Sequence, residues 1–158
     1  LSFDLGLAGV NEPLCILVQE SLAQIGIKVT INKVPGANWR NELLKKNMPL
    51  ITNTFGGWLN YPEYFFFWAY HGQNAVFNTM SYQNANMDKL INDARTAGAN
   101  ADKAGYEAAV KGFIDMSFEE VPRIPLYQPL LNVAMQKGIT GYRYWFHRQL
   151  DYRQLAKA

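Results

Sequence analysis

Residues 1–55 alternate between stretches with the two-residue period of a β-strand and stretches with the longer period of an α-helix. The alternation predicts strands at 1–7, 27–32 and 50–55, with a helix in each of the two gaps. A strand, helix, strand, helix, strand order favours a sheet with parallel members and helical cover. The expected fold class is therefore α/β, with a mixed sheet and flanking helices.

Both helices in these gaps carry recognisable boundaries. Asn11 is the expected N-cap of the first helix, with Pro13 in its first turn and Gly26 as its stop. The second helix is expected at 38–46, with Trp39 on its apolar side. The N-terminal part of the chain is therefore predicted to contain two strand and helix units with clear boundaries.

The remainder of the chain divides into three stretches. Residues 56–81 are expected to be irregular, because Gly, Pro and Asn interrupt them repeatedly. Amphipathic helices are expected at 86–97 and 101–120, where apolar residues recur at helical spacing. The tail is expected to contain short strands at 124–127, 131–136 and 142–146.

The charge and cysteine content exclude several classes of protein. The net charge of +2 is scattered without a basic block, so nucleic acid is not an expected partner. The longest apolar run, 64–70, is far shorter than the roughly 20 residues that cross a bilayer. Cys15 is the only cysteine, so these residues form no internal disulfide.

Local catalytic and metal motifs are absent from the sequence. It contains no Gly-x-Ser-x-Gly elbow, no phosphate-binding Gly-rich loop and no His-Glu-x-x-His helix. His71 and His147 are the only histidines, and a metal site would need ligands from separate elements. Glu119 and Glu120 diverge by roughly 100° on a helix and do not form an acid and base pair. No catalytic residue, metal or cofactor is therefore expected.

Large aromatic side chains are concentrated in the irregular stretch. Several of them must be core, because so many large rings are not all left in water. Trp58 and Tyr61 are the best candidates for a wall of a ligand cleft, since open α/β sheets bind ligands at strand ends such as that of 50–55. Polar orientation would come from Asn53, Asn60, Asn74 and Asn78.

Four segments of the chain, taken jointly and in order, resemble one known family. They are LAQIGIKV at 22–29, GWLNYPE at 57–63, FNTMSYQNANMDKLI at 77–91 and EEVPRIPLY at 119–127. Their order is similar to the C-terminal region of the bacterial extracellular solute-binding proteins of family 5. Members of that family are the substrate-binding components of peptide- and nickel-type ABC importers.

The resemblance implies one lobe of a type II periplasmic-binding-protein-like fold, in which two lobes close over a ligand by hinge motion. Residues 1–128 would form part of the C-terminal ligand-binding lobe. Residues 129–158 would pack back toward an N-terminal lobe of the same protein that is missing from this chain. In the absence of that lobe, four aromatic side chains of this segment are expected to be exposed: Tyr142, Tyr144, Trp145 and Phe146.

The resemblance also implies a function and its partners. The chain would capture a peptide-like or other small solute and deliver it to an ABC permease, with no enzymatic activity. The location would be periplasmic, or extracytoplasmic and membrane-associated. The ligand-binding residues expected on this basis are Trp58, Asn60, Tyr61, Glu63, Phe77 and Asn78.

One departure from the family pattern leaves the ligand open. Peptide-binding members carry an aspartate shortly after the Gly-Trp pair, and its charge meets the α-ammonium of the peptide. In this chain Asn60 is the residue nearest to the position of that aspartate. Its neutral amide cannot form the charge-assisted contact with the ammonium, which would contribute a few kcal/mol at most. Either Glu63 substitutes for the aspartate, or the ligand is uncharged, such as a sugar derivative or an opine-like compound.

Two other functions remain as alternatives. A hydrolase or transferase lobe would use Asp88 or Glu63 with His71, and it predicts that these side chains converge in one pocket. A purely structural or interaction domain predicts that the aromatic side chains of residues 56–78 are all buried. Both alternatives are decided by where the side chains lie.

Overall fold

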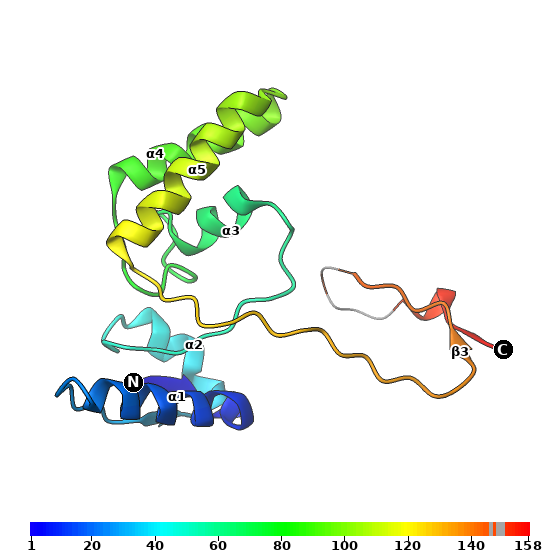
Figure 1. The fold of residues 1–158 in the computed structure, drawn as a ribbon, viewed down its shortest axis with the longest axis horizontal. Coiled ribbons are helices and arrows are strands. Elements are labelled where there is room, and N and C mark those ends of the chain that lie inside the picture. The colour runs from blue at the N-terminus through cyan, green and yellow to red at the C-terminus, as the bar shows by residue number, and fades with distance from the viewer. Residues whose placement is uncertain (146, 148–150) are drawn as a thin grey trace.

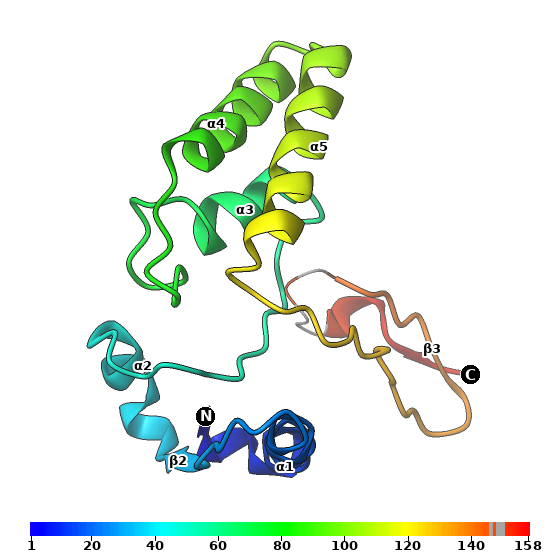
Figure 2. The ribbon, with the colours of Figure 1, turned by 60° about the vertical axis from the view of Figure 1, so that its left-hand side comes forward.

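The structure is a computed structural model that describes residues 1–145, 147 and 151–158. Three parts follow one another along the chain (Figures 1 and 2). A unit of short strands and helices comes first, and a unit of three helices comes second. The C-terminal residues extend away from both units.

The N-terminal unit contains a parallel pair of strands. Its elements are β1 (Ser2–Asp4), η1 (Leu5–Leu7), α1 (Ala8–Ala23), β2 (Asn32–Val34) and α2 (Gly36–Leu44). β1 and β2 pair with Ser2 opposite Asn32, and Ile51 adds an isolated parallel bridge to Ser2. The mixture of helices with a small parallel sheet agrees with the α/β class, although the strands are shorter than predicted.

The first strand ends, and the first helix begins, earlier than predicted. The strand expected over 1–7 ends at Asp4, because the Asp4 carboxylate accepts a hydrogen bond from the Gly6 amide at 2.8 Å and caps η1. This turn leads directly into α1. The prediction that Asn11 caps the helix was therefore wrong: Asn11 is buried inside α1, and Pro13 also lies within the helix.

The other two predicted strands are displaced or reduced. Of the strand predicted at 27–32, only Asn32 lies in a strand, as the first residue of β2, and residues 27–31 lead up to it. They still follow the edge of the sheet, since the N-terminal ammonium of Leu1 donates to the Thr30 carbonyl at 2.8 Å. The strand predicted over 50–55 is reduced to the bridge at Ile51. Hydrophobic alternation identified these segments but not the residues that pair.

A small core holds the N-terminal unit together. Phe3 and Cys15 are fully buried, and Trp39 of α2 is nearly so. The Cys15 thiol lies 3.5 Å from the Thr52 hydroxyl, which links α1 to the end of the unit. α2 was predicted at 38–46, and its observed bounds lie two residues earlier at each end.

The second unit consists of three helices. They are α3 (Pro62–Ala69), α4 (Ala85–Ala99) and α5 (Lys103–Glu120). The helices predicted at 86–97 and 101–120 are confirmed as α4 and α5. Asn84 and Asp102 cap them, because each side chain accepts hydrogen bonds from amides of the first turn.

α3 is the element that the sequence did not predict, since 56–81 was expected to be irregular. Pro62 occupies its first turn, where its fixed φ suits a helix start, and Glu63 lies near the positive end of the helix dipole. The ring of Phe66 lies 4.2 Å from that of Phe113 on α5. The buried core of the three helices consists of Ala69, Tyr70, Met87, Ile91, Ala94, Ala109 and Phe113.

The C-terminal segment is extended rather than strand-forming. α5 ends at Glu120, and the next residue, Val121, adopts a left-handed conformation with φ of 46°. The strands predicted at 124–127 and 131–136 were wrong, because no described residue pairs with them. The prediction at 142–146 also fails over 142–145, and Phe146 lies outside the described residues. The elements of this segment are β3 (Ile139–Thr140), η2 (Tyr152–Gln154) and β4 (Ala156–Lys157).

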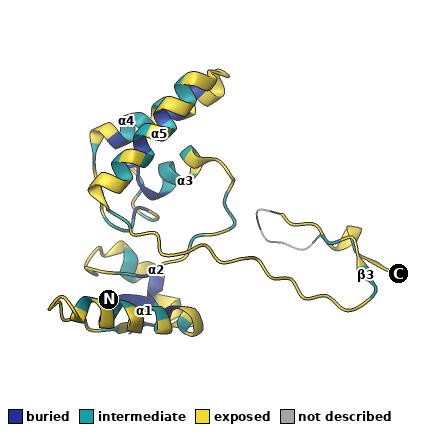
Figure 3. Cartoon of the chain, in the orientation of Figure 1, coloured by how far each residue is buried: buried dark blue, intermediate teal, exposed yellow. Residues whose placement is uncertain are grey.

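Most described residues of this segment are exposed, as Figure 3 shows, and they include large apolar side chains. Ile124 is 72% exposed and Leu130 is 87% exposed. Tyr144 and Trp145 are exposed as predicted, whereas Tyr142 is half-buried. Over the residues described, no helix combines the length and hydropathy that a membrane crossing requires.

Candidate ligand-binding surface

Trp58 lies at the centre of a cluster of aromatic rings. Its ring meets those of Phe55, Tyr64, Phe65 and Phe77 edge to face, with centroid distances of 5.1–5.9 Å. Edge-to-face pairs each stabilise by about 0.5–1.5 kcal/mol beyond the area they bury. Trp58 is thus held rigidly although it is only half-buried.

We call three rings of this cluster the aromatic wall: Trp58, Tyr64 and Phe77. Trp58 is half-buried, Tyr64 is 36% exposed and Phe77 is 39% exposed. Tyr61, which precedes α3, is more exposed still, at 59%. The prediction of a purely structural domain, in which all these rings are buried, was therefore wrong.

Local chain geometry places the aromatic wall. Gly57 has φ of 74°, a conformation that side chains other than glycine rarely adopt, and it turns the chain into Trp58. α3 then begins at Pro62 and carries Tyr64 and Phe65 back against the Trp58 ring. The short helix and the glycine turn together bring the rings into contact.

Asn78 fixes the loop that carries Phe77. It is buried, and its Nδ2 donates to the Tyr82 carbonyl at 2.7 Å while its Oδ1 accepts from the Tyr82 amide at 3.0 Å. Nδ2 also lies 3.4 Å from the His71 carbonyl. The Asn78 amide is occupied by the loop itself, so its observed contacts position Phe77.

The polar residues at the start of α3 are arranged differently. Asn60 is exposed, and Glu63 is half-buried and accepts a hydrogen bond from the Tyr106 hydroxyl of α5. Burial together with this hydrogen bond and the Glu63 charge raises the pKa of Tyr106 to about 12. Among the six predicted site residues, Trp58 and Phe77 are in ring contact. Asn60 and Tyr61 lie just before α3, and Glu63 lies in its first turn. Asn78 is buried.

His71 and Asp88 come close together, as the enzymatic alternative requires in part. His71 Nδ1 lies 3.7 Å from Asp88 Oδ1. However, Nδ1 accepts a hydrogen bond from the Gln73 amide, and Asp88 Oδ1 accepts one from the Gly72 amide at 2.8 Å. With its lone pair occupied by the backbone, Nδ1 presents no N–H to the carboxylate, and Glu63 bonds to a different residue. The observed contacts stabilise the loop.

Two cations that the sequence reasoning missed border the aromatic wall. Arg123 Nη2 donates to the carbonyls of Phe77 at 2.6 Å and Ala69 at 3.3 Å, and its guanidinium lies 4.6 Å from the centre of the Phe55 ring. Lys46 Nζ donates to the Asn78 carbonyl at 2.7 Å. The position of Arg123 inside the segment EEVPRIPLY was the available signal.

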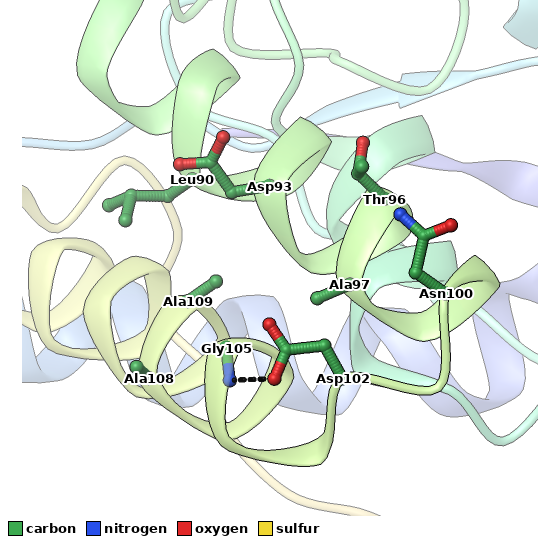
Figure 4. A pocket seen from close by; sticks show the side chains of 9 residues that line it. All are labelled: Leu90, Asp93, Thr96, Ala97, Asn100, Asp102, Gly105, Ala108 and Ala109. Carbon is green, nitrogen blue, oxygen red and sulfur yellow. Dashed lines mark hydrogen bonds between the residues drawn. The ribbon is translucent and has the colours of Figure 1, made fainter.

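Two hollows of the described surface lie away from the aromatic wall. One of about 550 Å³ lies between α4 and α5, where Asp102 bonds to the Gly105 amide (Figure 4). Asp93, which also lines it, is paired with Lys89. A second hollow, of about 410 Å³, is lined by residues of 128–131 and Tyr144. Within the described residues, no three His, Cys, Asp or Glu side chains gather in a way that suits a metal ion.

Comparison with known proteins shows which family this part of the chain is similar to. Residues 8–77 match the model of the bacterial extracellular solute-binding proteins, family 5, middle region. This match supports the resemblance to the family 5 solute-binding proteins that the sequence shows. The matched region includes Trp58, Asn60, Tyr61, Glu63 and Phe77.

A particular relative extends the match beyond this region. The chain is 27% identical over 142 residues to the oligopeptide-binding protein AppA of Bacillus subtilis (strain 168). The alignment covers 89% of this chain and 26% of that protein. The chain therefore spans only a small part of the length of its relative. Both comparisons support a substrate-binding role.

Proposed function

We propose that this chain forms part of the substrate-binding component of an ABC importer. It captures a peptide-like or other small solute in a cleft between two lobes and delivers it to a permease in the membrane. It acts in the periplasm or elsewhere outside the cytoplasm, attached to the membrane, and it catalyses no reaction. The observation that carries the proposal is the contact between the partly exposed rings of Trp58 and Phe77.

The aromatic wall suits ligand capture for physical reasons. Rings held edge to face lose little conformational entropy when a ligand covers them, and they offer a large apolar area. Both sides of the Phe77 loop are anchored, by Asn78 to Tyr82 and by Arg123 to the Phe77 carbonyl. A ligand that binds here meets a preformed surface. The polar selectors are Asn60 and Glu63, beside the start of α3.

The second lobe is proposed to come from the rest of the same protein. The extended residues 122–138 carry exposed apolar side chains, including Ile124 and Leu130, that lack a cover in the described structure. Packing of residues 129–158 against an N-terminal lobe would remove this surface from water. The aromatic wall would then face that lobe across a cleft that closes on the ligand.

Titration calorimetry of the full-length protein with oligopeptides tests this function. We expect saturable binding that Trp58→Ala weakens by about tenfold or more, equivalent to at least 1.4 kcal/mol. Phe118→Ala is the matched control, because Phe118 is exposed on α5 and lies outside the family match. Binding that survives Trp58→Ala unchanged would remove the aromatic wall from the site.

A further inference from the structure

Lys46 joins the two units of the fold. It follows the C-cap of α2 in the first unit, and its Nζ donates to the Ala75 carbonyl and to the Asn78 carbonyl, the latter at 2.7 Å. Both carbonyls belong to the loop between α3 and α4 in the second unit, which reaches toward α2 (Figures 1 and 2). One side chain therefore ties the end of α2 to the loop that carries Phe77.

The rest of the junction between the two units is sparse. Among the described helices and strands, every pair that packs extensively lies within one unit or within the C-terminal segment. Phe55 crosses the junction, where its ring meets those of Trp58 and Phe65 and lies against the Arg123 guanidinium. The relative position of the two units thus depends on a small number of side chains, and Lys46 is one of them.

The aromatic wall lies at this junction. Trp58 comes shortly after Ile51, whose bridge to Ser2 still belongs to the first unit, and Phe77 belongs to the loop that Lys46 holds. The rings of Trp58 and Phe77 meet edge to face with their centroids 5.1 Å apart. Because contacts between rings act only over a short range, a shift of the loop away from α2 would weaken this one.

The backbone of Lys46 has an unusual conformation for a lysine. Its φ is 55°, in the left-handed region, at the position after a helix C-cap where glycine is the usual residue. Such a conformation persists where the surrounding structure holds it. At Lys46 the two hydrogen bonds of the side chain provide that support. The side chain, and not the backbone, therefore accounts for a lysine at this position.

Other contacts hold the same loop from the second unit. Arg123 Nη2 donates to the Phe77 carbonyl at 2.6 Å, and Asn78 Nδ2 donates to the Tyr82 carbonyl at 2.7 Å. These bonds fix the shape of the loop and its place beside α4 and α5. Lys46 adds the hydrogen bonds that set the position of the loop relative to α2.

We propose that Lys46 is a positioning residue for solute capture, because its bonds to the Ala75 and Asn78 carbonyls hold Phe77 against Trp58. The inference rests on the proposed capture function and adds a residue outside the aromatic wall on which affinity depends. A surface that is already arranged loses less conformational entropy when a ligand covers it. Lys46 acts through Phe77 and makes no contact with the solute.

Calorimetry of the full-length protein with a mixture of pentapeptides tests this role. Lys46→Gly removes the side chain and suits the left-handed backbone, and it should weaken binding by about fivefold. Lys46→Arg keeps a positively charged donor and should recover part of the lost affinity. Lys45→Ala is the matched control and should bind normally, since Lys45 is exposed and paired with Glu42.

A double-mutant cycle separates positioning from general destabilisation. In a Phe77→Ala background the ring that Lys46 positions is absent, so Lys46→Gly should change affinity by less than about twofold. Equal losses of affinity in the two backgrounds overturn the proposal, because Lys46 then does not act through Phe77. Unchanged affinity in Lys46→Gly also overturns it and leaves solute capture standing. Failure of the unsubstituted protein to bind these peptides and every other solute class overturns the proposed function itself.

Discussion

The side chain of Arg123 is bonded to the backbone of Phe77, with Nη2 and the carbonyl oxygen 2.6 Å apart. A residue just beyond α5 thereby fixes the loop that supplies one ring of the aromatic wall. The same guanidinium reaches the end of α3 through the Ala69 carbonyl. Arg123 thus joins three segments that are distant in the sequence.

Arg123→Met is expected to destabilise the full-length protein by about 2–3 kcal/mol, because hydrogen bonds to charged groups stabilise by about 1.5–3 kcal/mol and the Phe77 carbonyl loses its partner. Chemical denaturation measures this change. Arg40→Met is the control, since Arg40 is exposed on α2, and it should change stability by less than about 0.5 kcal/mol. Equal effects of the two variants would contradict the role assigned to Arg123.

Phe77→Ala should separate binding from folding. The ring is 39% exposed and touches Trp58 and Trp68 at its edges, so its loss should cost about 1 kcal/mol of stability. Ligand affinity should fall more steeply, because the ring forms part of the surface that the ligand covers. Denaturation and calorimetry on the same sample measure the two effects. A variant that is destabilised yet binds normally would place the ligand elsewhere.

Asn78 and Asn60 are expected to behave in opposite ways. Asn78→Ala leaves the Tyr82 amide and carbonyl without their partner, which should destabilise the protein by about 1–3 kcal/mol. Asn60→Ala changes an exposed side chain and should lower only ligand affinity. Thermal unfolding with and without ligand compares the two variants. Loss of stability in Asn60→Ala would show that the start of α3 was misassigned.

The contact between Tyr106 and Glu63 predicts a particular alkaline pH dependence. The folded protein raises the pKa of Tyr106 to about 12, above the value of about 10 expected for an unfolded chain. The stabilisation from the neutral hydroxyl is therefore complete below pH 10 and is lost as the pH rises from about 10 to about 12. Tyr106→Phe should flatten this part of the curve of unfolding midpoint against pH. An unchanged curve would contradict the assigned contact.

Periodicity predicted the elements that neighbouring residues determine. α4 and α5 followed from apolar spacing, and their observed caps, Asn84 and Asp102, act within one turn of helix. The parallel sheet followed from the alternation of strand and helix. The short length of its strands could not be predicted in this way, because strand pairing depends on residues far apart in the sequence, such as Ser2 and Ile51.

The candidate site was predictable in composition and less so in geometry. Trp58 and Tyr61 were expected to form a cleft wall, and that role stays a prediction, while the structure brings the Trp58 ring into contact with Phe77. α3 was missed because its aromatic run lacks the polar face of an amphipathic helix. The role of Arg123 was missed as well. Its contacts are with rings and carbonyl groups far away in the sequence, and such contacts produce no periodic pattern of residues.

Thermal unfolding of the full-length protein with added solutes tests solute capture most directly, because a ligand that binds the folded state raises the midpoint by mass action. The solutes are oligopeptides, opines, sugar derivatives and nickel. We predict a saturable rise with one class that Trp58→Ala abolishes. A midpoint that no class raises, accompanied by turnover of a test substrate, would contradict the account.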